Sequence, residues 1–188
     1  MTATAFRTLG LAPLAFFAIY AAAAANGERA GDALWMCHVA NLVLGLGMIL
    51  ERPAWIRVAA AWIVLGIPLW VIDMATSGTV CPFSTISHVG GLAVAIFALN
   101  RVRATRNEWI GGVALLVAMQ LVARLATPEA LNVNLAWRPY EGFERWPGGY
   151  PGYWASLMAG AAFTLWGIGR VMQAAFPPRP AITERSIP

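Results

Sequence analysis

The sequence has no lysine and few charged residues of any kind: 13 arginines and 9 acidic residues make up 12% of its 188 positions. A soluble domain of this size carries about twice that charged fraction. Apolar residues make up 59% of the chain, and the mean hydropathy is +0.62. A soluble fold would leave much of this apolar surface facing water. The composition therefore argues against a soluble domain and favours an integral membrane protein.

Cysteine is also scarce, with only Cys37 and Cys81 and no CxxC pair. Two cysteines are too few for a disulfide scaffold or a structural zinc site. A single Cys37–Cys81 disulfide is an alternative if the two residues lie in an oxidising compartment. A basic face for nucleic acid is lacking as well, because the arginines lie between apolar runs, as topology signals do. We therefore expect no metal and no nucleic-acid partner.

Six apolar runs dominate the chain, each near the roughly 20 residues that a helix needs to cross a hydrocarbon core. In lipid every backbone N–H must be satisfied within its segment, so these runs predict helices. The runs are Leu9–Ala25, Ala33–Leu50, Ala54–Asp73, Phe83–Asn100, Trp109–Ala126 and Gly152–Phe176. The prediction is an all-α, polytopic protein, with one six-helix transmembrane domain over residues 1–176 and a proline-rich cytoplasmic tail over residues 177–188.

The start of the chain also resembles a cleavable signal peptide. Arg7 precedes an apolar stretch that ends in Ala23-Ala24-Ala25 before Asn26. The run is longer than most signal-peptide cores. We therefore expect it to be retained as the first transmembrane helix.

The arginines are distributed unevenly between the two sides that six alternating helices define. Nine fall on the side of the two termini and four on the other side. Under the positive-inside rule both termini are cytoplasmic, and the connections after the first, third and fifth runs face outward. We expect a multi-pass protein of the cell inner membrane. Its longest connection, Thr127–Pro151, faces outward, and long aperiodic connections are often functional.

Polar residues gather near the outward-facing ends of the runs. Such side chains are costly in a membrane and tend to be paired or functional. Cys37 with Asn41, and Ser84 with His88, are four apart and so share a helix face. We hypothesise a membrane-lipid site, with the head group among the polar residues and the acyl chain along the apolar inner halves. The candidate site residues are Cys37, His38, Asn41, Asp73, Ser84, His88, Asn132, Asn134 and Arg138.

Cys37 and His88 carry the chemical hypothesis. A histidine can take the proton of a thiol nucleophile and return it to a leaving group. One alternative is that Cys37 is an ordinary buried cysteine. A separate alternative is that His38 and His88 are axial ligands of a b-type haem, although no spacing motif supports haem. Asp73 is either a solvated helix-end residue or an orienting partner for a histidine. Arg138 suits an interfacial contact with a nearby glutamate or a lipid phosphate.

Four short segments resemble a known family and occur in its order along the chain. They are Leu34-Trp35-Met36-Cys37-His38, Ile86-Ser87-His88-Val89-Gly90, Asn132–Pro139 and Trp146–Trp154. Together they resemble YwaF-like bacterial membrane proteins and their eukaryotic counterpart, a transmembrane cysteine acyltransferase acting on ether phospholipids. The arrangement is more distantly similar to the androgen-induced transmembrane hydrolases. The resemblance implies Cys37 as nucleophile and His88 as general base.

The leading hypothesis is therefore a membrane lipid acyl hydrolase or acyltransferase that works through a thioester on an outward-facing Cys37–His88 dyad, without a cofactor. Asn41, Asn134 or backbone N–H groups are the candidate donors to the oxyanion. One alternative is a non-catalytic accessory subunit of a larger membrane complex, which implies a protein partner. The other is a b-type haem membrane protein.

Overall fold

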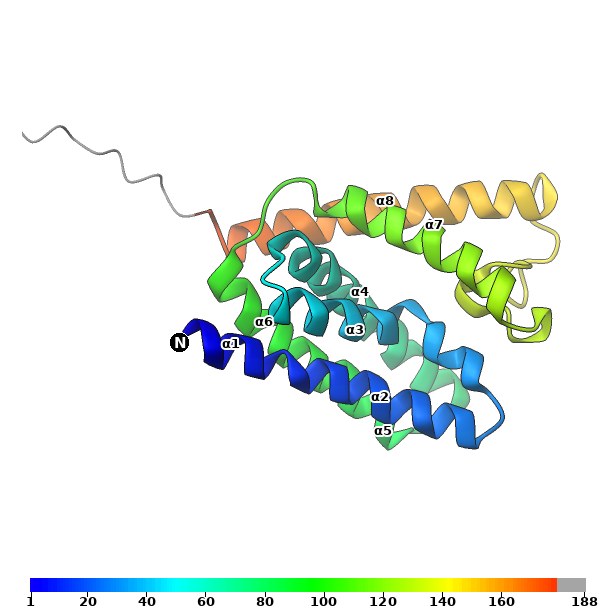
Figure 1. Ribbon diagram of the computed structural model, residues 1–188. Helices are drawn as coiled ribbons and strands as arrows, with labels where there is room; N and C mark the ends of the chain where they lie inside the picture. Colours follow the sequence, from blue (N-terminus) through cyan, green and yellow to red (C-terminus); the bar gives the residue numbers. More distant parts are fainter. Residues whose placement is uncertain (179–188) are drawn as a thin grey trace, which may run out of the picture.

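The computed structural model describes residues 1–178, and in this part of the chain every regular element is helical (Figure 1). Most of the expected tail, residues 179–188, lies outside the described residues. The all-α prediction is confirmed. The elements are α1 (Ala3–Leu9), α2 (Leu11–Asn26), η1 (Ala30–Leu34), α3 (Met36–Ile49), α4 (Pro53–Ser77), α5 (Pro82–Thr85), η2 (Ile86–Gly90), α6 (Gly91–Val102), α7 (Glu108–Ala126), η3 (Glu129–Leu131), η4 (Val133–Leu135) and α8 (Gly149–Ala175).

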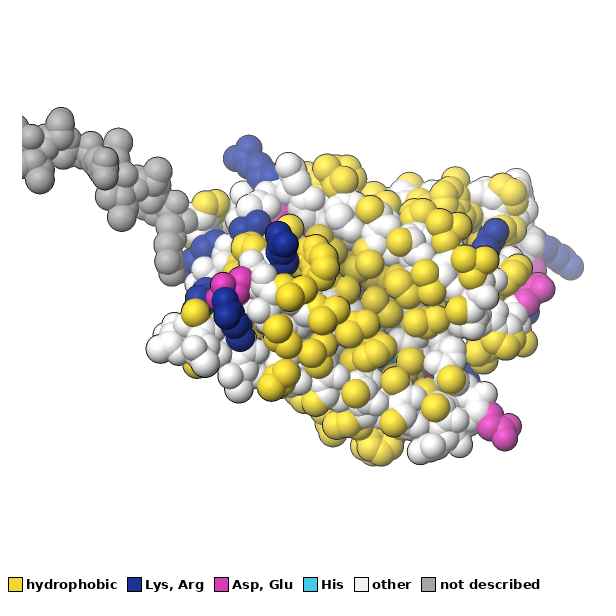
Figure 2. Space-filling model, viewed as in Figure 1, with side chains coloured by type: hydrophobic (Ala, Val, Ile, Leu, Met, Phe, Trp, Pro, Cys, Tyr) yellow, Lys and Arg dark blue, Asp and Glu magenta, His cyan; other side chains and the backbone are white. Residues whose placement is uncertain are grey.

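The chain is a multi-pass membrane protein. Five helical segments are long and apolar enough to cross a membrane, and α3 is a shorter apolar helix of 14 residues. An apolar band lies between two ends that carry the charged side chains (Figure 2). The N-terminus and the end of α8 lie at the same end of the molecule (Figure 1). The five segments are Ala3–Asn26, Pro53–Ser77, Pro82–Val102, Glu108–Ala126 and Gly149–Ala175.

The second segment differs from its predicted bounds. The apolar run begins at Ala33, but residues 30–34 form the 3₁₀ turn η1, and Trp35 is extended with ψ 139°. The α-helix α3 therefore begins only at Met36. As a result Cys37 is the second residue of the helix, where backbone N–H groups have no partner within the helix. This position matters for the chemistry of the thiol.

Helix α3 packs closely against the first segment and against α4. The first segment is interrupted at Gly10, between α1 and α2, because Pro13 lacks the N–H that would bond the carbonyl of Leu9. A methyl group on Gly45 of α3 would lie 2.7 Å from the carbonyl oxygen of Gly10, so the two backbones approach only because glycine occupies position 45. On its other side α3 packs along α4, which also contacts α6, α7 and α8. The helix α4 is therefore the centre of the bundle.

Charged side chains cluster at the end that holds the N-terminus. Glu51, between α3 and α4, accepts a hydrogen bond from Arg7 at 3.0 Å and lies 4.0 Å from Arg101. The hydrogen bond and the positive charge of Arg7 lower the pKa of the exposed Glu51 carboxyl. Arg57 of α4 donates to the carbonyls of residues 102 and 103 and so closes the end of α6. The positive-inside rule predicts that this end is cytoplasmic.

Candidate functional site

Cys37 and His88 come from different helices and meet over Gly66 of α4. A methyl group placed on Gly66 would lie 3.4 Å from Cβ of Cys37 and 3.8 Å from Nε2 of His88. Cβ of Cys37 and the imidazole of His88 therefore approach the same glycine, which leaves a methyl-sized gap between them. His88 is buried, whereas Cys37 is half-buried. The structure thus brings the two predicted catalytic residues to the same glycine, next to the start of α3.

A π-helical turn orients the imidazole of His88. The turn η2 replaces regular α-helix between α5 and α6, and such turns are frequent at functional sites. Nδ1 of His88 lies 2.8 Å from the carbonyl oxygen of Ser84 and 3.4 Å from its hydroxyl. Because a carbonyl oxygen can only accept, the hydrogen bond places the proton on Nδ1. Nε2, on the side facing Gly66, then carries the free lone pair.

The start of α3 surrounds Cys37 with backbone N–H groups. Asn134 caps the helix: its Oδ1 accepts from the N–H of Met36 at 2.9 Å, and its Nδ2 donates to the carbonyl of Leu34 at 2.8 Å. Cys37 is the second residue of α3, where a backbone N–H has no carbonyl acceptor within the helix and suits an anionic oxygen.

A hydrogen-bond network ties α3 to η2. Nδ2 of Asn41 lies 3.1 Å from the carbonyls of Cys37 and Ser87 and from the Ser87 hydroxyl. That hydroxyl lies 3.2 Å from Nδ1 of His38 and can donate its proton there. A side chain at Gly91 would collide with the amide of Asn41. The network holds Cys37 in register with His88, and it engages the Asn41 amide that was a predicted oxyanion donor.

Aromatic side chains cover both histidines. Tyr20 of α2 stacks on His38 with ring centroids 3.4 Å apart, and Trp70 of α4 stacks on His88 at 5.2 Å. The two imidazoles lie 5.7 Å apart at a steep angle. These stacking contacts and the hydrogen bonds of each Nδ1 account for the positions of both histidines through protein groups alone. His38 therefore serves the network around the dyad, beside rather than within the Cys37–His88 pair.

The predicted loop residues shape the long connection rather than the gap over Gly66. Asn132 and Asn134 have φ of 45° and 54°, the left-handed region that asparagine tolerates. Oδ1 of Asn132 accepts from the N–H groups of Trp137 and Arg138, each at 3.1 Å. Arg138 is exposed and donates to the carbonyl of Ala130 at 3.3 Å. Within residues 1–178 it forms no ion pair with a glutamate, so that suggested contact is not made.

The remaining predicted residues flank the site. Asp73 is exposed near the end of α4, on the helix face that also carries Gly66 and Trp70. Its carboxylate forms no ion pair within the described part of the chain. Cys37 and Cys81 are not joined by a disulfide in this structure.

Three features of the site were missed in the sequence. Gly66 looked like an ordinary glycine of an apolar run, and the stacking of Tyr20 and Trp70 on the histidines has no sequence signal. The π turn leaves no sequence signal either: Ser87 and His88 are adjacent buried polar residues, but the regular helix α3 also buries adjacent residues, from His38 to Asn41.

No protein-family model, no curated protein and no solved structure matches the chain. The fold and the site define it as a multi-pass membrane protein in which a cysteine and a histidine approach the same glycine at one end of a helical bundle. The resemblance to YwaF-like proteins stays a prediction, and a proposal of function depends on the geometry.

Proposed function

We propose that the chain is a membrane lipid acyl hydrolase or acyltransferase that forms a thioester on Cys37, with His88 as general base. The observation that carries this proposal is the arrangement across Gly66, where the unprotonated Nε2 of His88 faces the same gap as Cys37. The Ser84 carbonyl holds the tautomer, as the aspartate does in a Ser-His-Asp triad. The resemblance of the segments around Cys37 and His88 to a cysteine acyltransferase supports the same two roles.

The first half-reaction forms the thioester. Nε2 of His88 takes the proton of the Cys37 thiol, and the sulfur attacks the carbonyl carbon of a lipid ester. The carbonyl π electrons move to oxygen, and the backbone N–H of Cys37 donates to this oxyanion. The oxyanion then collapses and the C–O bond breaks. His88 returns the proton to the departing alkoxide, which leaves as a lysolipid alcohol.

The second half-reaction releases the acyl group. Water, or the hydroxyl of an acceptor lipid, enters where the lysolipid left and gives its proton to Nε2 of His88. Its oxygen attacks the thioester carbonyl, the C–S bond breaks, and the thiolate of Cys37 recovers the proton. The products are a free fatty acid in the first case and a new ester in the second. Asn41 keeps Cys37 in register throughout, through its bonds to Cys37 and Ser87.

The surface around the site suits a substrate that arrives from the bilayer. Leu69 and Ile72 of α4 are exposed, and so are Ile86 and Val89 of η2. In a membrane these side chains contact lipid tails, so an acyl chain can lie against them while its ester reaches Cys37. The arginine distribution predicts that this end of the bundle faces outward, and we expect the chain in the inner membrane of the cell.

The test is labelling of the detergent-purified protein with an ester-type activity probe, followed by mass spectrometry of the Cys37 peptide. We expect an acyl adduct on wild type, none on Cys37→Ala, and a strong loss on His88→Gln. Cys81→Ala is the matched control and should label like wild type, because Cys81 is exposed and outside the gap. Wild-type protein with free thiols that never forms the adduct would refute the proposal.

The same preparation separates the alternatives. A partner that co-purifies at fixed stoichiometry with an unlabelled Cys37 would favour an accessory subunit. A Soret band that is lost in His38→Ala and His88→Ala would establish a b-type haem protein, in which the two imidazoles serve as axial ligands.

A further inference from the structure

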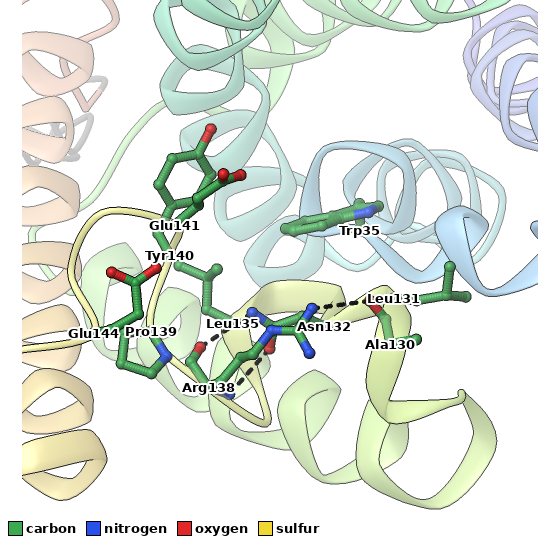
Figure 3. Close-up of a pocket in the computed structure, with 10 residues that line it drawn as sticks. All are labelled: Trp35, Ala130, Leu131, Asn132, Leu135, Arg138, Pro139, Tyr140, Glu141 and Glu144. Carbon is green, nitrogen blue, oxygen red and sulfur yellow. Dashed lines mark hydrogen bonds between the residues drawn. The ribbon is translucent and has the colours of Figure 1, made fainter.

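A cavity lies beside the candidate site, between the start of α3 and the long connection. Its volume is about 320 Å³, at the small end of the range for ligand pockets. Two aromatic side chains, one guanidinium and two carboxylates contribute to its wall (Figure 3). Trp35 lies on one side, Tyr140, Glu141 and Glu144 lie across from it, and Arg138 lies along a third side.

The charges that face this cavity are not neutralised by each other. Within the described residues Arg138 forms no ion pair with Glu141 or Glu144. Arg138 uses one N–H on the carbonyl of Ala130 and keeps its other donors. The N–H of Gly142 donates to Glu144, which lowers the pKa of that carboxyl and keeps it ionised at neutral pH. A cation and two anions thus face one small space from different sides.

We propose that this cavity binds the head group of a zwitterionic phospholipid, the substrate of the neighbouring dyad. The phosphate contacts the guanidinium of Arg138, which suits phosphate oxygens. The cationic amine lies against Glu141 and Glu144, with the aromatic faces of Trp35 and Tyr140 adding cation–π attraction. A zwitterion matches both charges of the wall, whereas an anionic glycerol head group leaves the carboxylates unsatisfied.

The position of the cavity relative to Cys37 supports the assignment, which rests on the proposed function. Trp35 lines the cavity and precedes Cys37 by two residues, so their Cα atoms are at most about 7.6 Å apart. A glycerophospholipid carries its ester carbonyls only a few bonds from its phosphate. The cap formed by Asn134 joins the connection that builds the cavity to the start of α3. Head group and ester therefore fall on the two sides of Trp35.

The experiment measures binding of short-chain phosphatidylethanolamine, phosphatidylcholine and phosphatidylglycerol to the full chain in detergent, by calorimetry. The Cys37→Ser variant is used, so that turnover does not obscure binding. We expect the two zwitterionic lipids to bind about tenfold more tightly than phosphatidylglycerol. Glu141→Gln with Glu144→Gln should remove this preference, and Arg138→Gln should weaken all three lipids, because each carries a phosphate.

Matched controls come from the same connection. Glu129 and Arg145 are exposed and do not line the cavity, so Glu129→Gln and Arg145→Gln should leave binding unchanged. Tyr140→Leu gives a second route, since it removes an aromatic face without changing charge and should weaken the zwitterionic lipids alone.

Equal binding of the three lipids, or a preference that survives in the double glutamine variant, would overturn the assignment. The outcome is separate from that of the proposed function. Zwitterionic lipids bound selectively by a protein that never forms a Cys37 thioester would uphold the cavity and reject the enzyme. A Cys37 thioester formed equally from all three lipids would uphold the enzyme and reject the cavity.

Discussion

Substituting Gly66 with alanine tests the gap between Cys37 and His88 most directly. The added methyl group would lie 3.4 Å from Cβ of Cys37, and 3.7 and 3.8 Å from Cδ2 and Nε2 of His88. These are ordinary van der Waals distances, so the helix bundle can accept the methyl group without moving. Alanine also removes the entropic penalty of a mid-helix glycine, about 0.5–1 kcal/mol. We therefore expect Gly66→Ala to be folded and at least as stable as wild type.

Chemistry should respond in the opposite direction. The methyl group fills the space in which Nε2 of His88 approaches the thiol and the ester carbonyl, and a misplacement of about 1 Å can lower a rate by roughly 100-fold. The assay pairs thermal unfolding in detergent with the rate of acyl labelling of Cys37. Gly160→Ala on α8 is the matched control, since no atom lies within 4 Å of a methyl group there. A stable Gly66→Ala protein that labels at the wild-type rate would refute the reasoning.

Three further substitutions test the fold around the site by thermal unfolding. Asn134→Ala removes both hydrogen bonds of the Asn134 amide at the start of α3 and should destabilise the protein by about 2 kcal/mol. Asn134→Gly loses the same bonds but tolerates the left-handed backbone, so it should lose less stability. Equal losses of stability in the two variants would contradict this. Gly45→Ala brings a methyl group to 2.7 Å from the Gly10 carbonyl oxygen and should cost about 1–3 kcal/mol, so a neutral effect would show that the helices are not in contact there. Arg7 lowers the pKa of Glu51 in the folded protein. Their contact therefore stabilises the fold at any pH above the pKa that Glu51 has in the unfolded chain, and this stabilisation is lost as the pH falls through the lower pKa of the folded protein. The stability difference between wild type and Glu51→Gln should therefore be present at neutral pH and vanish in acid, and a difference that persists in acid would argue against this contact.

The helices were predictable because the apolar runs are long and arginines separate them. The start of α3 was not, because η1 and α3 are both apolar, and hydropathy does not distinguish a 3₁₀ turn from the first turn of an α-helix. The difference moved the helix start to Met36 and placed Cys37 in the first turn. Boundaries of this kind are set by capping contacts, here with Asn134, which is distant in sequence.

The site was predictable in its members more than in their roles. Depth alone grouped Cys37, Asn41 and His88 near one end of the bundle. Spacing placed Ser84 on the face of His88, but the partner is the backbone carbonyl of Ser84 more closely than its hydroxyl. Asn134 was expected to bind the substrate, and in the structure its amide bonds to Met36 of α3 and to Leu34 of η1. Roles of this kind depend on three-dimensional pairing, which spacing along one helix does not encode.

The cap that Asn134 places on α3 has a consequence for biosynthesis. Residues 36 and 134 are 98 positions apart, so α3 receives its cap only after α7 has left the ribosome. A nascent chain that has been inserted only as far as α6 holds both Cys37 and His88, but the start of α3 is still uncapped. The surroundings of Cys37 are therefore completed late in assembly, once the connection between α7 and α8 has folded against the start of α3.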